Sequence, residues 1–269
     1  MLPPLTHIRR MAQLIRASKS GNDWTPNDLL AYNIRIEHQD SRTFFGVPDL
    51  PQPHVDNEVL TASDANATTH DDTYALLRTM DLAMNAIPGE ESAVDDFAVH
   101  LFKAVNYTGR AVGRVARTRK DLPFWVCGHQ RHAKTDVCIV DASDILLLVQ
   151  EDKRHMDGSD PEPLIIAEAI AAFHSNNETR VRTLDLPPLQ SKVLPCITMK
   201  GTMPTFYKIP VTAELVRAVQ LGVYPEEETV VYAHLPPVPR PARRYSEGMR
   251  PLDNRQVVLS CYEAFKQFL

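Results

Sequence analysis

The amino-acid sequence predicts an α/β or α+β fold in which a mixed central sheet is flanked by helices. From residue 91 onward, a helical pattern is followed by three short apolar segments, a second helix and further strand-like segments. This order is typical of layered arrangements of helices on a sheet. The chain has 269 residues with 43% hydrophobic and 23% charged residues, which is typical of a globular protein with a sizeable core.

Charge is distributed unevenly along the chain, although the formal net charge of −5 excludes a strongly basic, histone-like nucleic-acid binder. Residues 1–100 hold 7 Lys and Arg against 15 Asp and Glu, a net charge of −8. Residues 101–269 hold 22 against 19, a net charge of +3. We expect residues 1–85 to form an acidic N-terminal elaboration that packs on a core formed by residues 86–269. Such a surface could shield a binding groove or contact a separate partner.

Local patterns predict the elements of the first half in turn. Pro26, directly after Thr25, is typical of the first turn of a helix. Residues 46–72 are rich in Pro, Asp, Asn and Thr, which favours an extended arm or a long loop. Helical patterns are expected at residues 8–19, from about Asp72 to Asn85, and over residues 91–107, where the apolar stripe is clearest.

The second half carries the predicted sheet. Short runs rich in β-branched, aliphatic or aromatic residues and bounded by polar residues are typical of strands. They occupy residues 123–127, 135–141, 145–150, 193–200, 205–211 and 229–235. An alanine-rich segment that begins with proline and ends with two asparagines predicts a helix over residues 161–177. Two further helices are expected, at residues 212–222 and 254–268.

One predicted hairpin brings charged residues together. If residues 143–144 form a two-residue turn, Asp136 lies opposite Glu151, and Lys153 shares the face of Glu151 because side chains alternate along a strand. Opposed Cβ atoms lie about 5 Å apart, so the two carboxylates would repel each other unless a cation lay between them. Hard oxygen ligands suit Mg²⁺ or Mn²⁺. A lysine beside such an ion could orient or deprotonate a water for attack on phosphorus.

This arrangement resembles the PD-(D/E)XK nuclease superfamily, whose shared core is a helix, a three-stranded meander, a helix and another strand. The signature is an Asp on the second strand and Glu/Asp-x-Lys on the third, which Asp136 and the Glu-Asp-Lys triplet at 151–153 match. The Pro of the signature is absent, because Thr135 precedes Asp136. The resemblance covers residues 91–210. It implies a restriction-endonuclease-like core and metal-dependent hydrolysis of DNA or RNA, with Mg²⁺ or Mn²⁺ as cofactor.

The resemblance also implies roles for acidic residues on the flanking helices. Many members place an acid on the helix before the meander, where Glu91 or Asp95 could match it, with Glu91 as a further metal ligand. Many place Gln, Glu or Lys on the helix after it, where Glu168 could match. Glu168 could instead belong to a polar network in the core. Segments such as AEAIAAF and PTFYKIPVT also resemble uncharacterised proteins from mushroom-forming fungi, a likeness that implies no function.

Basic residues near the first two core strands are candidates for contact with a nucleic-acid backbone. They are Arg110, Arg114, Arg117, Arg119, Lys120 and His132. Phosphate binding needs clustered cations more than a positive net charge. A solvated helix face would explain the arginines equally well, and an ordinary polar loop would explain His132.

Several alternatives stay open. The fold could carry a degenerate site and act as a non-catalytic binding protein. Zinc is disfavoured because Cys127, His129, His132 and Cys138 show no ligand pair at the usual spacing. Four cysteines without close pairing favour a reduced, intracellular protein in the cytoplasm or nucleus. No apolar run of 18 residues and no signal-peptide pattern occur, so no membrane partner is expected. The oligomeric state is not predicted.

Overall fold

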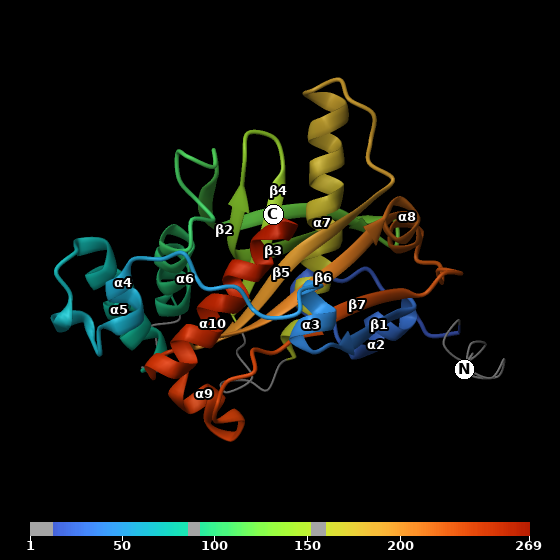
Figure 1. Cartoon of the computed structure of the whole chain (residues 1–269). Coiled ribbons are helices and arrows are strands. Elements are labelled where there is room, and N and C mark those ends of the chain that lie inside the picture. The colour runs from blue at the N-terminus through green and yellow to red at the C-terminus, as the bar shows by residue number, and fades with distance from the viewer. Residues whose placement is uncertain (1–12, 86–91, 152–159) are drawn as a thin grey trace.

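A mixed sheet with the strand order β1-β7-β6-β5-β4-β3-β2 runs through the computed structural model (Figure 1). The structure describes residues 13–85, 92–151 and 160–269, with the backbone alone for residue 151. The strands of these ranges are β1 (Ile34–His38), β2 (Val115–Val126), β3 (His129–Val140), β4 (Ile145–Glu151), β5 (Ser191–Lys200), β6 (Met203–Thr212) and β7 (Thr229–His234). The β4–β5 and β1–β7 pairs are parallel and the other neighbours are antiparallel.

Helices cover both faces of this sheet. They are α2 (Pro26–Ala31), α3 (Ser41–Phe45), α4 (Asn57–Thr61), α5 (Asp71–Met84), α6 (Ala93–Ala104), α7 (Pro161–Arg182), α8 (Ala213–Leu221), α9 (Arg244–Glu247) and α10 (Leu252–Phe265). One apolar cluster joins α7, α2 and α8 to one face, and a second joins α5, α6 and α10 to the other. The predicted α/β class, with a mixed sheet between helices, is therefore confirmed.

The apolar stripe of the helix expected over residues 91–107 packs as predicted. Val94, Ala98, Leu101 and Val105 are all buried. Helix α2 begins at Pro26 with a capping box, in which the Asp28 carboxylate accepts a hydrogen bond of 2.8 Å from the backbone N–H of Thr25. The helical pattern over residues 8–19 is not realised where it is described, because residues 13–19 form no helix.

Helix α7 continues to Arg182, five residues beyond the predicted end. Its two asparagines make tertiary contacts instead of ending it. The Asn176 side chain accepts from the backbone N–H of Ile145 at 2.8 Å and donates to its carbonyl at 2.9 Å, which ties the helix to β4. The C-terminal end of α7 projects beyond the sheet (Figure 1).

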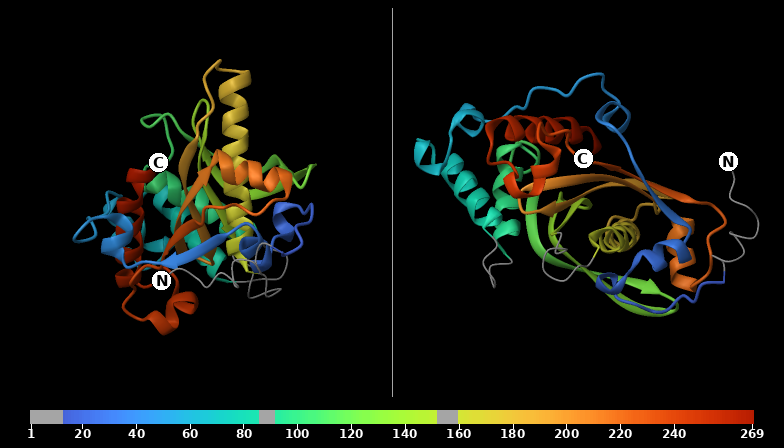
Figure 2. Two further views of the ribbon diagram at one scale, coloured as in Figure 1. Left: turned by 90° about the vertical axis from the view of Figure 1, so that its right-hand side faces the viewer. Right: turned by 90° about the horizontal axis from the view of Figure 1, so that it is seen from below.

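The β2–β3 hairpin is longer than predicted, and it bends around α7 (Figure 2). Its two-residue turn consists of Cys127 and Gly128, with φ of 50° and 76°. Positive φ at both positions is the conformation that tight hairpin turns with a right-handed twist require. The two strands therefore form one continuous ribbon over residues 115–140, whereas the sequence predicted short strands at residues 123–127 and 135–141.

Residues of the first 85 contribute to the sheet and to its core. Strand β1 pairs with β7 at the sheet edge, and Phe44 and Phe45 are buried beside α10. Within residues 46–72, the expected loop contains α4 and one turn of 3₁₀ helix at Ala65–Ala67. The boundary at residue 85 stays a prediction.

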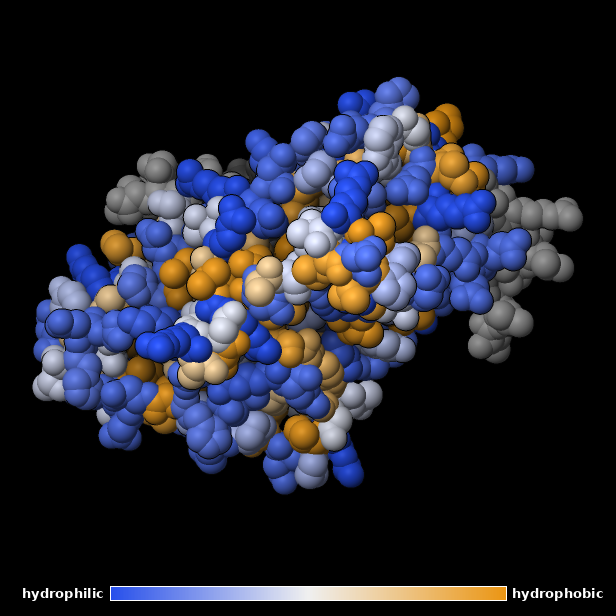
Figure 3. All heavy atoms as spheres, turned by 90° about the horizontal axis from the view of Figure 1, so that it is seen from above, coloured by the Kyte–Doolittle hydropathy of each residue, from blue (hydrophilic) through white to orange (hydrophobic). Residues whose placement is uncertain are grey.

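The surface at the projecting end of α7 is partly apolar. Figure 3 looks down on this end of the molecule and shows apolar patches among polar residues. Exposed apolar side chains on and after the last turns of α7 are Val181, Leu184, Leu186 and Val193. No helix of the described ranges is long and apolar enough to cross a membrane.

Candidate functional site

The register between β3 and β4 differs by one residue from the predicted register. The ladder pairs Val137 with Val149, so Asp136 is level with Gln150 and not with Glu151. The predicted two-residue turn is wrong because residues 141–144 form a four-residue loop, with an irregularity between residues 139 and 140. The Asp141 carboxylate holds this loop by accepting hydrogen bonds of 2.8 and 2.7 Å from the backbone N–H groups of residues 143 and 144.

Asp136 and Gln150 lie side by side across the two strands. The Gln150 Nε2 donates a hydrogen bond of 2.6 Å to Asp136 Oδ2. Gln150 is buried, whereas Asp136 is half-buried at the end of an apolar stretch of β3. The buried amide therefore fixes the orientation of a carboxylate that retains access to solvent.

Polar side chains continue this row across the sheet. Gln150 is paired in register with Thr198 of β5, which is also buried. The Thr198 hydroxyl lies 3.4 Å from Tyr207 Oη, which in turn donates to Glu162 at 3.2 Å in the first turn of α7. A polar layer thus interrupts the apolar interface between the sheet and the start of α7.

Glu168 is a buried carboxyl close to this layer. It is fully buried on α7, and among the residues that the structure describes neither carboxyl oxygen has a hydrogen-bond partner. Burial raises the pKa of Glu168 well above its usual range, and the neighbouring charge of Asp136 raises it further. The nearby Thr135 hydroxyl lowers the pKa of Glu168. Its hydrogen, however, is directed at the backbone carbonyls of Val137 and Val149 and not at the Glu168 carboxyl. An ionised carboxylate that is buried without a partner is costly, so such a carboxyl is expected either to be protonated or to bind a cation.

The other predicted site residues are only partly described. Glu151 ends β4, where its backbone is paired with Met199. Glu91 and Lys153 lie outside the described residues. Asp95 lies in the first turn of α6. Of the predicted acids, Asp136 and Glu168 are close enough for the charge of Asp136 to raise the pKa of Glu168. The roles of Glu91, Glu151 and Lys153 stay predictions.

Sequence reasoning missed Gln150, Thr198 and Tyr207. Gln150 ends an apolar strand and Thr198 lies inside another. A polar residue in such a position could have been recognised from the sequence as a candidate for a buried polar site. Only the register shows that they are level, because β4 and β5 are separated in the sequence by α7.

The predicted phosphate-contacting cations are spread over a turn and two strands. His132 lies on β3 and not in a loop, with Nδ1 2.7 Å from Asp121 Oδ2. Arg117, Arg119 and Lys120 lie on β2, so a helix face does not explain them. Arg114 donates to the carbonyl of Leu269 at 3.3 Å. Arg110 lines a cleft of about 910 Å³ beside α5 and α6.

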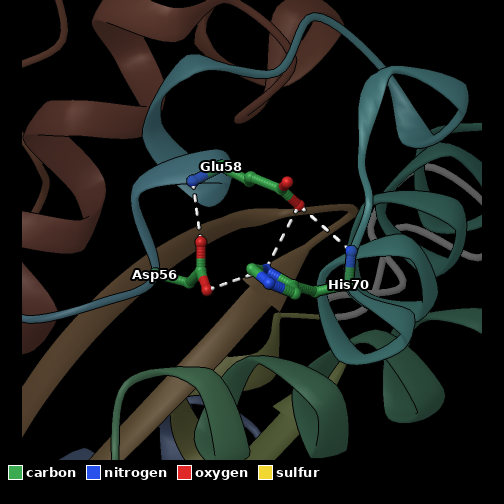
Figure 4. Close-up of side chains that lie close together, drawn as sticks. All are labelled: Asp56, Glu58 and His70. Carbon is green, nitrogen blue, oxygen red and sulfur yellow. Dashed lines mark hydrogen bonds and ion pairs between the residues drawn. The ribbon is translucent and has the colours of Figure 1, made fainter.

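Asp56, Glu58 and His70 form a cluster of potential metal ligands on the surface near α4 and α5 (Figure 4). His70 Nδ1 lies 3.1 Å from Asp56 Oδ2 and 3.5 Å from Glu58 Oε2. Asp56 also caps α4, and Glu58 accepts hydrogen bonds from the hydroxyl and the backbone N–H of Thr69. These contacts fix the connection between α4 and α5, which accounts for the cluster without an ion.

Three of the four cysteines are buried in the core, and Cys127 is half-buried in the β2–β3 turn. Cys138 and Cys196 are fully buried against α7, and burial raises the pKa of the Cys138 thiol to about 11. Such a thiol stays protonated and is a poor zinc ligand at neutral pH.

No protein-family model matches the chain, and no curated protein matches it.

Proposed function

We propose that the protein is a metal-dependent nuclease that hydrolyses phosphodiester bonds of DNA or RNA. The proposal depends mainly on the fully buried and unpartnered carboxyl of Glu168 beside Asp136. Two carboxyls in one site, one of them without a counter-charge among the described residues, fit a hard divalent cation. Mg²⁺ or Mn²⁺ would be held by Asp136 with Glu168, and Glu91 is the further ligand that the sequence predicts. Glu151 is not level with Asp136, so its role as a ligand stays a sequence prediction.

The arrangement of strands supports a restriction-endonuclease-like core as part of this proposal. Helix α6, the antiparallel meander β2–β3–β4, helix α7 and strand β5 follow one another in the expected order. Strand β5 is parallel to β4, so α7 is the crossover between them. Asp136 and Glu168 come from the meander and from that crossover helix.

The chain's own groups would prepare the site. Gln150 orients Asp136, and the apolar environment of Glu168 excludes water and strengthens its interaction with any cation. A bound Mg²⁺ or Mn²⁺ supplies polarisation of the phosphate and a water of lowered pKa. Lys153, in the predicted role, orients the attacking water.

The test is cleavage of labelled single- and double-stranded DNA and RNA in Mg²⁺ or Mn²⁺. We expect cleavage by the wild-type chain, and a loss of at least about 100-fold in Asp136→Asn and in Lys153→Ala. Asp185→Asn, at an exposed carboxylate after α7, is the control and should cleave normally. A wild-type chain that cleaves none of the four substrates, or an Asp136→Asn variant with full activity, would refute the proposal.

The second candidate is a non-catalytic binding protein on the same fold. The one-residue register difference favours it, because Glu151 is not level with Asp136 as a two-carboxylate pair would require. Calorimetry separates the two functions. Nucleic-acid binding without measurable Mn²⁺ binding supports the second candidate.

A further inference from the structure

The β2–β3 hairpin has one buried face and one exposed face. Leu122, Phe124 and Val126 are buried against α7 and its neighbours, and they alternate with the exposed Trp125 and the half-buried Pro123 on β2. The cross-strand pairs of the outer face are Asp121 with Lys134, Pro123 with His132, and Trp125 with Gln130. We call the outer side chains of residues 121–134, with Arg119 at their end, the hairpin platform.

Trp125 is the unusual member of this platform. Its side chain is 44% exposed, whereas Trp24, the other tryptophan, is 5% exposed and stacks on Tyr32 with ring centroids 5.4 Å apart. Aromatic side chains on an exposed sheet face provide a flat surface on which a nucleobase can stack. The indole is flanked on β3 by the polar residues Gln130 and His132 and not by an apolar patch.

Unpaired cations lie along the same hairpin. Within the described residues, Arg117, Arg119, Lys120 and Lys134 take part in no ion pair, whereas most lysines and arginines outside this region have an acidic or carbonyl partner. The carboxylate of Asp121 is already engaged, because His132 Nδ1 lies 2.7 Å from its Oδ2. The hairpin platform therefore offers positive charge without fixed counter-charges.

The platform ends close to the proposed catalytic site along the strands, although it faces away from α7 whereas the polar row of Asp136 and Gln150 faces α7. Lys134 precedes Asp136 by two residues on β3, and the flanking pairs Thr118–Val137 and Lys120–Thr135 place Arg119 level with Asp136. Trp125 is six residues from Arg119, which is about 20 Å along an extended strand. This length accommodates a short stretch of an extended polynucleotide.

We propose that the hairpin platform binds single-stranded nucleic acid, with a base stacked on Trp125 and the backbone phosphates on Lys134 and Arg119. A single strand exposes the faces of its bases, whereas a duplex hides them and would use the cations alone. This inference rests on the proposed function for the class of substrate, and it specifies the strandedness of that substrate.

Tryptophan fluorescence tests the proposal directly. The full chain in EDTA is titrated with an oligothymidine and with a blunt duplex of the same length. We expect saturable quenching by the oligothymidine and little by the duplex, because Trp125 is exposed and Trp24 is buried. Trp125→Ala should lose the quenching and bind the single strand about 10-fold or more weakly, and Trp125→Phe should restore part of the affinity.

Variants of the cations provide the matched comparison. Lys134→Ala and Arg119→Ala should each weaken binding and reduce the slope of log affinity against log salt by about 0.7. Arg78→Ala, at an exposed arginine on α5, should change neither. Binding by Trp125→Ala at wild-type affinity, unchanged fluorescence at saturation, or equal affinity for the duplex would overturn the proposal.

The EDTA condition separates this inference from the proposed function, because binding is measured without cleavage. Stacking on Trp125 in a chain that never cleaves would support the platform and refute the nuclease. Cleavage at the wild-type rate by Trp125→Ala, without stacking on Trp125, would support the nuclease and refute the platform.

Discussion

Gln150 holds Asp136 through a hydrogen bond of 2.6 Å that joins the end of β4 to the middle of β3. The donor is buried and the acceptor is half-buried, so the bond lies where the polar layer of the sheet meets solvent. Carboxylates that are oriented in this way make better ligands, since less freedom is lost when a cation binds. The polar layer therefore contributes to the site even though Gln150 itself carries no charge.

Replacement of Gln150 by Met keeps the side-chain volume and removes this bond. If Asp136 is a metal ligand, we expect the affinity for Mn²⁺ to fall roughly 10- to 100-fold, as is typical when the partner of a ligand is lost. Isothermal titration calorimetry measures this change. Gln130→Met, at an exposed glutamine of β3, is the control, and equal Mn²⁺ affinities in the two variants would contradict the expectation.

Glu168 predicts a particular dependence of stability on pH. Its pKa in the folded state is raised by burial above the ordinary value of 4.5. The folded chain therefore retains a proton that the unfolded chain releases, and the free energy of unfolding falls as pH rises above about 4.5, until the folded-state pKa is passed. Glu168→Gln has no titrating group at this position. As pH rises through this range, the free energy of unfolding of Glu168→Gln should therefore increase relative to that of the wild type by up to about 1.4 kcal/mol per pH unit.

Urea unfolding in EDTA between about pH 5 and about pH 8 measures the Glu168 effect. Glu214→Gln, at an exposed glutamate on α8, should follow the wild type. Parallel pH profiles for the wild type and Glu168→Gln would show that Glu168 ionises normally in the fold.

Arg255 is a buried guanidinium that connects distant backbone segments. It donates to four carbonyl oxygens at 2.8 to 3.1 Å, those of Val59, Ala62, Met249 and Arg250. Arg255→Met would leave buried acceptors unsatisfied, at about 1–3 kcal/mol each, so we expect the free energy of unfolding to fall by about 3 kcal/mol or more. Urea unfolding gives the value, with the exposed Arg217→Met as control. A loss below about 1 kcal/mol would mean that water replaces the guanidinium.

A chain that begins at residue 86 should not fold alone. It lacks β1, which covers the edge of β7, and it lacks Phe44 and Phe45, which fill the core beside α10. We expect aggregation in size-exclusion chromatography and no cooperative transition by circular dichroism. Co-expression with residues 1–85 as a separate chain should restore both. A monomeric, cooperatively folded 86–269 chain would instead support the predicted domain boundary.

The sequence predicted most elements because their signals are local. Thr25 and Pro26 mark the start of α2, and the stripe of Val94, Ala98 and Leu101 marks the buried face of α6. These patterns depend on contacts within one turn of helix or on burial alone. For the same reason the class of the fold followed from the order of elements.

The register between β3 and β4 at the candidate site depends on side-chain hydrogen bonds in the connecting loop, and the prediction of this register was wrong. The Asp141 carboxylate occupies backbone donors of the loop, so the turn has four residues instead of two. A change of one residue moves the partner of Asp136 from Glu151 to Gln150. Similarly, Asn176 seemed to end a helix, but its amide binds the backbone of β4. The spacing of apolar residues does not predict hydrogen bonds in which a side chain takes the place of a backbone donor or acceptor.

The pairing of β1 with β7 has a consequence for synthesis on the ribosome. Arg35 of β1 and Glu228 beside β7 form an ion pair of 3.3 Å across a separation of 193 residues. The first strand therefore emerges long before its partner exists, and closure of this long loop is a late event. Until then its edge is open to wrong pairing. We expect the net charge of −8 in residues 1–100 to repel other nascent chains of the same kind and so to oppose such wrong pairing.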